Sequence, residues 1–234
     1  MLRPSMSTAF RVLGTPCCSS GNPSQHNLEE HPMRWSRVLC LLVVSGGLYS
    51  AAAAQATGLP SFNAPYRAFQ RSEIGLVLTF PDGGGTAFEG AYRFASGKFD
   101  LGFRGGIFDP GGTGNATLLV GAEARERVVT HTEDFPLDGA LILGVGGALV
   151  SGNSELFVPV GLSLGRRVDP KNSKVSIVPY VQPTGLLAAG SGNSDFFFTL
   201  GLGADFRLSP RFDARISAGL GDVEGVSISA VWVH

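Results

Sequence analysis

The feature that most constrains the fold is an alternation of apolar residues with polar or small ones, which recurs along most of the chain. In the last stretch, Gly225–Val233, Ile228 and Trp232 fall on one face of an extended chain, and Ser227 and Ser229 fall on the other. A period of two residues is that of a β-strand, because successive side chains of a strand point to opposite faces. The sequence therefore predicts strands.

Ten segments show this period, and each approaches the roughly 9–11 residues that a tilted strand needs to cross a membrane. Turn-forming residues separate them, as in Pro81–Gly85 and Ser209-Pro210. Because these turns are short, we expect consecutive segments to pair as antiparallel hairpins. The ten segments are Arg71–Phe80, Thr86–Phe94, Lys98–Phe108, Asn115–Arg127, Phe135–Val150, Glu155–Arg167, Lys174–Leu187, Asp195–Leu208, Arg211–Leu220 and Gly225–Val233.

The composition agrees with an all-β chain. Only 16% of the residues are charged and 44% are hydrophobic, yet no apolar run approaches the roughly 20 residues of a membrane helix. Glycine is abundant, with 33 residues, as in chains of many short strands and turns. The formal net charge of −1 includes no basic excess, so we do not expect a nucleic-acid partner.

One face of nearly every segment is apolar. In a soluble barrel or sandwich this face would be the core, whereas in a membrane barrel it would contact lipid. Aromatic residues on this face gather near the segment ends, as they do at the two interfaces of a bilayer, which favours the membrane barrel. The predicted aromatic girdles consist of Phe80, Phe88, Phe94, Phe99, Phe196, Phe206, Phe212 and Trp232.

The opposite face combines charges of both signs with glycine and alanine, which suits the crowded inside of a small barrel. Because unpaired buried charge is costly, we expect the charges to form a salt-bridged plug near the periplasmic end of the lumen. This network comprises Glu73, Glu89, Arg93, Asp100, Arg104, Glu123, Arg125, Arg127, Asp205, Arg207, Asp213 and Arg215. The outer half is expected to form an apolar cup lined by Val77, Leu119, Phe157, Leu186 and Phe197.

The amino-terminal region predicts export. Residues 33–56 combine a basic start, a short apolar core and an Ala-x-Ala end, as in a secretory signal peptide cut after Ala56. Residues 1–32 are a polar extension without pattern, and residues 57–70 are expected to be a periplasmic lead-in to a barrel formed by residues 71–234. All three cysteines lie in the first forty residues, so the exported part contains none.

The carboxyl-terminal segment Gly225–His234 carries a resemblance. It is similar to the assembly signal of bacterial outer-membrane barrels, a terminal strand with alternate apolar residues and an aromatic at or near its end. Trp232 matches that aromatic, and His234 departs from it. Residues 57–234 resemble a small bacterial outer-membrane β-barrel, which implies a closed antiparallel up-and-down barrel. The sequence favours ten strands, with eight as the alternative.

The resemblance implies outer-membrane lipid and the barrel-assembly machinery, through the terminal strand, as partners. We expect no catalytic activity, metal or cofactor, because the exported part has only His131 and His234 as histidines. The expected role is structural or a small-ligand or surface interaction. Two alternatives stay open: a lipid-modifying enzyme or protease embedded in the outer membrane, and a secreted soluble β-barrel that binds an apolar ligand.

Overall fold

The computed structural model describes residues 56–66, 70–150, 152–171, 173–190 and 192–234. The predicted extension at 1–32 and the predicted leader at 33–56, apart from Ala56, lie outside the described residues.

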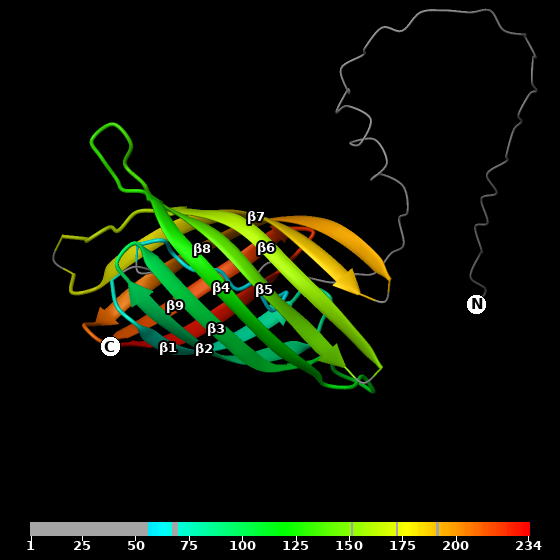
Figure 1. Cartoon of the computed structure of the whole chain (residues 1–234). Helices are drawn as coiled ribbons and strands as arrows, with labels where there is room; N and C mark the ends of the chain where they lie inside the picture. The colour runs from blue at the N-terminus through cyan, green and yellow to red at the C-terminus, as the bar shows by residue number, and fades with distance from the viewer. Residues whose placement is uncertain (1–55, 67–69, 151, 172, 191) are drawn as a thin grey trace, which may run out of the picture. The chain divides into compact units, whose positions relative to one another are not determined.

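Ten β-strands form in the described chain, and each overlaps one of the ten segments that the alternation predicts (Figure 1). The strands are β1 (Glu73–Pro81), β2 (Thr86–Ser96), β3 (Phe99–Asp109), β4 (Thr117–Val129), β5 (Asp138–Val150), β6 (Asn153–Gly165), β7 (Ser176–Gly190), β8 (Asn193–Ser209), β9 (Phe212–Gly221) and β10 (Gly225–Val233).

The strands close into a barrel in which every strand pairs with its neighbours in sequence. The barrel closes where β1 pairs antiparallel with β10, in a register that runs from Glu73 opposite Val233 to Pro81 opposite Gly225. No strand edge is left unpaired among the ten strands, as a membrane-spanning sheet requires. The predicted all-β, up-and-down barrel is confirmed, with ten strands rather than eight.

We call the end at which β1 begins and β10 ends the terminal end of the barrel. Two very short turns lie there, residues 97–98 and 210–211, together with the longer connections 130–137 and 166–175. Gly97 has φ 64°, a left-handed conformation that glycine adopts without steric cost and that lets β2 turn back into β3.

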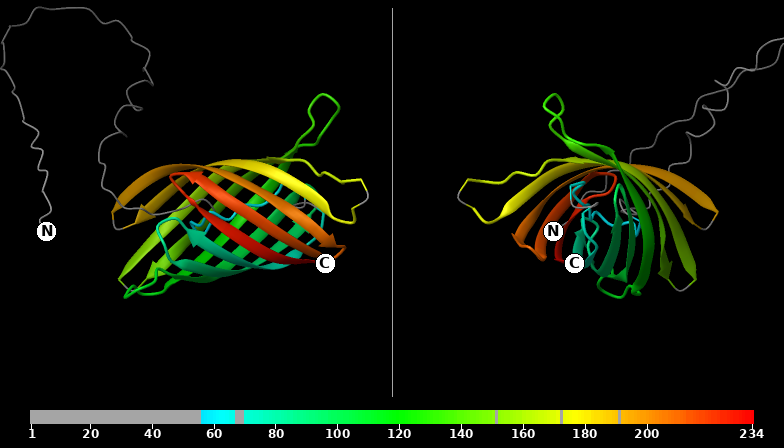
Figure 2. Two further views of the ribbon diagram at one scale, coloured as in Figure 1. Left: turned by 180° about the vertical axis from the view of Figure 1, so that it is seen from behind. Right: turned by 60° about the vertical axis from the view of Figure 1, so that its left-hand side comes forward.

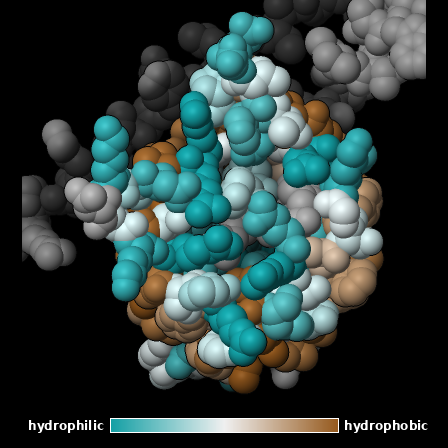
Figure 3. Space-filling model, turned by 90° about the vertical axis from the view of Figure 1, so that its left-hand side faces the viewer, coloured by the Kyte–Doolittle hydropathy of each residue, from teal (hydrophilic) through white to brown (hydrophobic). Residues whose placement is uncertain are grey.

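Exposure alternates along the strands with the polarity opposite to that of a water-soluble barrel. In β1, Ile74 and Leu76 are more than half exposed, whereas Glu73 before them and Thr79 after them, which point to the other face, are buried. Figure 3 looks at the terminal end, where hydrophilic residues gather across the end face and hydrophobic residues lie at its margin. An apolar exterior around a polar interior is the arrangement of a transmembrane β-barrel.

Most of the aromatic residues predicted to form girdles lie on this exterior. Phe80, Phe88, Phe94, Phe99, Phe196 and Trp232 are exposed, and Phe206 and Phe212 are half-buried between their neighbours. Within the described chain, no helix is long and apolar enough to cross a membrane.

Candidate functional site

The inside of the barrel holds a stretch of the chain that precedes the first strand. Residues 56–66, which we call the lumenal segment, pass through the ring of strands (Figure 2). Nine of these eleven residues are buried, and Asn63 and Tyr66 are half-buried. The sequence predicted a periplasmic lead-in here; the described part of it lies in the lumen instead.

Hydrogen bonds attach the lumenal segment to three strands. The Phe62 N–H donates to Ser217 Oγ on β9 at 3.1 Å, and the Phe62 carbonyl accepts from the Tyr180 hydroxyl on β7 at 2.9 Å. Ser163 on β6 donates to the Asn63 carbonyl at 2.9 Å. The backbone polar groups of a non-regular segment therefore find partners inside the barrel, as buried peptide groups require.

Glycines of the barrel wall make room for the lumenal segment. A Cβ added at Gly201 would lie 2.5 Å from the Phe62 ring, and one at Gly219 would lie 2.9 Å from Pro60. A Cβ at Gly121 would lie 2.7 Å from the Cβ of Ala56. Because real side chains do not approach so closely, the wall and the segment fit only while these positions are glycine.

Near the terminal end, Arg93 lies at the centre of a buried group of carboxylates. Its guanidinium is 3.3 Å from both Glu73 and Asp100, and it also forms a close ion pair with Glu123. Asp100 in turn accepts two hydrogen bonds from Arg125, each at 3.0 Å. Such two-pronged arginine–carboxylate contacts fix both charge and orientation.

Arg215 links a second group of acids to the first. It donates to both carboxylate oxygens of Glu73, at 3.0 and 2.6 Å, and its Nε lies 3.1 Å from Asp205. Asp213 lies 3.9 Å away. We call these buried groups the ion-pair layer. Its members are Glu73, Arg93, Asp100, Glu123, Arg125, Asp205, Asp213 and Arg215.

The four remaining predicted charges lie around this layer. Arg104 pairs with Glu89 at 2.8 Å and also donates to the Ser61 hydroxyl at 3.0 Å, so it joins the wall to the lumenal segment. Arg127 and Arg207 are half-buried at the ends of β4 and β8. All twelve predicted charges therefore have side chains on the inward side of their strands, and ion pairs between different strands include Arg93–Glu123, Arg104–Glu89 and Arg125–Asp100.

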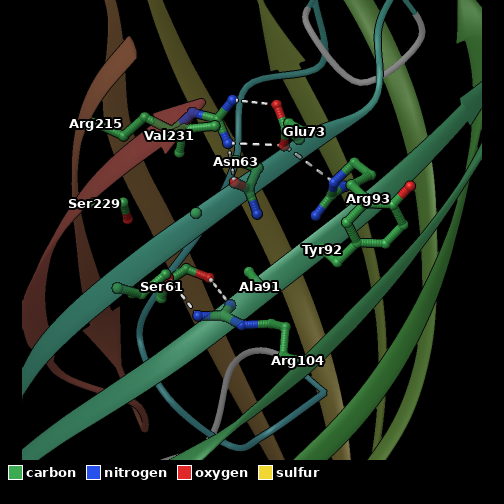
Figure 4. A pocket seen from close by; sticks show the side chains of 12 residues that line it. Ser61, Asn63, Glu73, Ala91, Tyr92, Arg93, Arg104, Arg215, Ser229 and Val231 are labelled. Carbon is green, nitrogen blue, oxygen red and sulfur yellow. Dashed lines mark hydrogen bonds and ion pairs between the residues drawn. The ribbon is translucent and has the colours of Figure 1, made fainter. Parts of the chain in front are cut away.

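A small void lies beside the place where the lumenal segment meets the ion-pair layer, at which Arg215 donates a hydrogen bond to Asn63 Oδ1 at 3.0 Å. Its volume is about 20 Å³, and Ser61, Asn63, Arg93, Arg104 and Arg215 contribute to its lining (Figure 4). In Figure 4, Glu73 lies between the guanidinium groups of Arg215 and Arg93, and Asn63 points toward Arg215. A void of this size admits about one water molecule, which is far too little for a continuous aqueous path.

A much larger cavity lies at the other end of the barrel. We call it the cup; its volume is about 460 Å³, within the ~300–1,000 Å³ range of small-molecule sites. Leu119 and Phe157 line it, as the sequence predicted, together with Thr57–Leu59 of the lumenal segment. Phe108 and Ala148 complete much of its apolar wall.

The other predicted cup residues lie deeper or elsewhere. Leu186 is fully buried in a cluster with Phe157, and Phe197 packs against that cluster. Val77 lines the small void rather than the cup, together with Ser61 and Asn63 of the lumenal segment. The wall of the cup also includes one ionisable side chain, Glu155, which is half-buried.

At the terminal end, Arg167 links the connection after β6 to Tyr66 of the lumenal segment. It donates to the Tyr66 hydroxyl at 3.0 Å and lies 5.5 Å from the centre of the Tyr66 ring. It also pairs with Asp169 at 2.8 Å. Partial burial acts to raise the pKa of the Tyr66 hydroxyl, but hydrogen bonds with Arg167 and Gln70 and the positive charges of Arg167 and Arg207 together outweigh it, so the pKa lies below its ordinary value.

The described residues include no group of three or more His, Cys, Asp or Glu side chains arranged to hold a metal ion. His131, in the connection after β4, contacts Asp138 at 3.1 Å and is half exposed at the terminal end, the end of the barrel opposite the cup. This pair fixes the connection to β5.

Comparisons with known proteins give no family model and no curated relative that matches the chain. Among solved structures, a de novo designed transmembrane β-barrel is similar, with a TM-score of 0.36 and 15% identity over 71% of this chain and 97% of the design. The β domain of the Bordetella autotransporter Brka is similar with a TM-score of 0.42 and 11% identity, over 70% and 98% of the two chains. The fold assignment rests on the strand pairing and exposure described above.

Proposed function

We propose that this chain is a non-enzymatic outer-membrane barrel with a closed lumen, which binds a small apolar molecule in the cup. The observation that carries the proposal is the burial of the lumenal segment, because it occupies the lumen and also lines the cup. The terminal end then faces the periplasm, since both the start of β1 and the end of β10 lie there. The cup faces outward.

Closure of the lumen is tested by conductance. The purified barrel in a planar bilayer is expected to give no sustained open current, because the lumenal segment and the ion-pair layer obstruct the path in series. Water-filled barrels need about 16 strands, and ten strands leave too little width beside the segment. A sustained large current from the unmodified protein would contradict the proposal.

Ligand binding is tested with N-phenyl-1-naphthylamine, an apolar dye that fluoresces when it leaves water. We expect saturable binding, and we expect Ala148→Trp to weaken it, because Ala148 lines the cup and an indole there would occupy part of its volume. The matched control is Ala214→Trp, which enlarges a residue on the exterior of β9 and should leave binding unchanged. Equal dye binding by both variants would refute the cup as the site.

The rival function is that of a membrane-embedded hydrolase. Such an enzyme would need a nucleophile and a base that converge in the cup, where Glu155 is the one ionisable side chain among the described lining residues. We therefore expect no turnover of a fluorogenic acyl ester by the purified barrel. Turnover that Glu155→Gln removes would support the enzyme instead.

Export by the predicted leader and assembly through β10 complete the proposal. Deleting Trp232–His234 should greatly reduce recovery from the outer-membrane fraction, because it removes the aromatic end of the strand and the pairing of Trp232 with Ile74. The full-length chain should be extracted from that fraction only by detergent. Recovery of the full-length chain in the soluble periplasmic fraction would contradict the localisation, and normal recovery of the deletion would contradict assembly through β10.

A further inference from the structure

The ladder between β5 and β6 is interrupted in the middle of the barrel wall. Leu143 pairs with Val160 and Gly146 pairs with Phe157, but the two positions between them are not bridged, although the register is the same on both sides. The unbridged residues are Gly144, Val145, Val158 and Pro159, which we call the seam. Proline has no N–H to donate, so Pro159 removes one of the hydrogen bonds that would close the ladder.

The next ladder is interrupted in the same way. Between Gly161 opposite Thr184 and Leu164 opposite Val181, two positions of β6 and β7 are unbridged, and one of them is Pro183. The ladders β2–β3, β3–β4 and β7–β8 are continuous over their described lengths. The β4–β5 and β8–β9 ladders have register shifts at Arg127/Val129 and Arg207/Ser209, near the terminal end, so the two interruptions that contain a proline both involve β6.

The seam adjoins the cup in the barrel wall, although none of its four residues lines the cup. Phe157, which lines the cup, immediately precedes Val158, and Ala148 on the facing strand also lines the cup. On the outer side, Val145 is about half exposed on the apolar exterior. Gly144 and Gly146 have no side chains on the inner side of the wall, and Ala56 of the lumenal segment packs against them there, so a molecule that passes between the strands must also displace Ala56.

We propose that the ligand of the cup is an apolar molecule dissolved in the bilayer, which passes between membrane and cup through the seam. The proposal rests on the cup being a binding site, as proposed above. Opening any continuous ladder within the hydrocarbon would expose backbone groups that cannot be solvated there. At the seam one of those hydrogen bonds is already missing, because Pro159 has no N–H to donate, so the wall parts there at a lower cost than in a continuous ladder.

Two disulfide pairs test the route, since the exported part of the chain has no cysteine of its own. In the double variant Val145→Cys/Val158→Cys, the two cysteines lie opposite each other across the seam. Their oxidation to a disulfide links β5 to β6 there and prevents the strands from parting. Leu141→Cys with Leu162→Cys is the matched control, because these residues pair four positions away in a bridged part of the same ladder. Folding of each variant is verified by its faster gel migration before heating.

The measured quantity is the rate at which N-phenyl-1-naphthylamine, added to proteoliposomes, reaches the cup. The oxidised seam lock should slow this rate by about tenfold or more, which corresponds to a barrier higher by at least ~1.4 kcal/mol. Reduction should restore it, and the control lock should leave it unchanged. Pro159→Ala, which supplies the missing N–H, should slow the rate without any cross-link.

Saturable dye binding with an unchanged rate in the oxidised seam lock would overturn the seam and leave the cup as a binding site. An equal slowing by both locks would also overturn it, because the effect would then follow from general stiffening of the β5–β6 pair. Absence of saturable binding to the unmodified protein would instead refute the proposed function itself. The two failures are therefore distinguishable.

Discussion

Replacing Arg215 by Met is expected to lower the free energy of unfolding by about 3–5 kcal/mol, the cost of leaving buried charges without their partner. Arg215 contacts Glu73 through two hydrogen bonds and lies 3.1 Å from Asp205. Methionine fills part of the same volume but cannot compensate either carboxylate. Urea unfolding in detergent micelles, followed by tryptophan fluorescence, measures the loss.

The control for this substitution is Arg166→Met, which removes an equal charge from an exposed position after β6. We expect its stability to change by less than about 0.5 kcal/mol, as is usual for surface substitutions. If Arg215→Met and Arg166→Met unfold at the same urea concentration, the ion-pair layer does not stabilise the barrel.

Gly201→Leu is expected to expel the lumenal segment or to destabilise the barrel by about 1–3 kcal/mol, the usual cost of overpacking. A Cβ at this position would already lie 2.5 Å from the Phe62 ring, and the rest of the leucine has no free volume beside it. Displacement exposes the segment, so limited proteolysis should cut the variant between residues 57 and 66. Urea unfolding measures the change in stability.

Gly83→Leu is the matched control, because a Cβ at Gly83 meets no atom within 4 Å. It should remain resistant to the protease and unfold like the unmodified protein. Resistance and unchanged stability in Gly201→Leu would mean that Phe62 does not occupy the place beside β8 described above.

The sequence predicted the barrel well because its signal is local. Alternation within ten residues places Glu73 inside and Ile74 outside without knowledge of any other strand. Closure followed from an even number of strands and the apolar terminal strand. The inward charges, too, could be assigned from the alternation of side chains along each strand. Their partners, such as Asp205 for Arg215, depend on how neighbouring strands are aligned, which the alternation does not specify.

The lumenal segment could not be predicted in this way. Residues 56–66 have no period, and Pro60 and Pro65 suggested a linker. Their burial depends on residues more than a hundred positions away, such as Gly201 and Ser217. The available signal was the excess of inward glycines, which the sequence analysis assigned to the narrowness of the lumen rather than to a segment that fills it.

The cup was predicted in part for a related reason. Parity identified Leu119 and Phe157 as inward residues of the outer half, and both line the cavity. It could not tell that Leu186 would be covered by packing against other side chains, or that Thr57–Leu59 would form part of the lining. Both facts depend on the position of the lumenal segment: its Phe62 and Ala64 belong to the cluster that contains Leu186, and its first residues line the cup.

Thiol accessibility tests the central claim, the burial of the lumenal segment, most directly. Ala64→Cys introduces the only cysteine of residues 57–234, at a position that is 1% exposed. In the folded barrel, a charged maleimide should label it about a hundredfold or more slowly than Glu133→Cys on the exposed connection after β4, and both should react alike in urea. Equal labelling rates in the folded protein would show that the segment lies outside the lumen and would contradict the account.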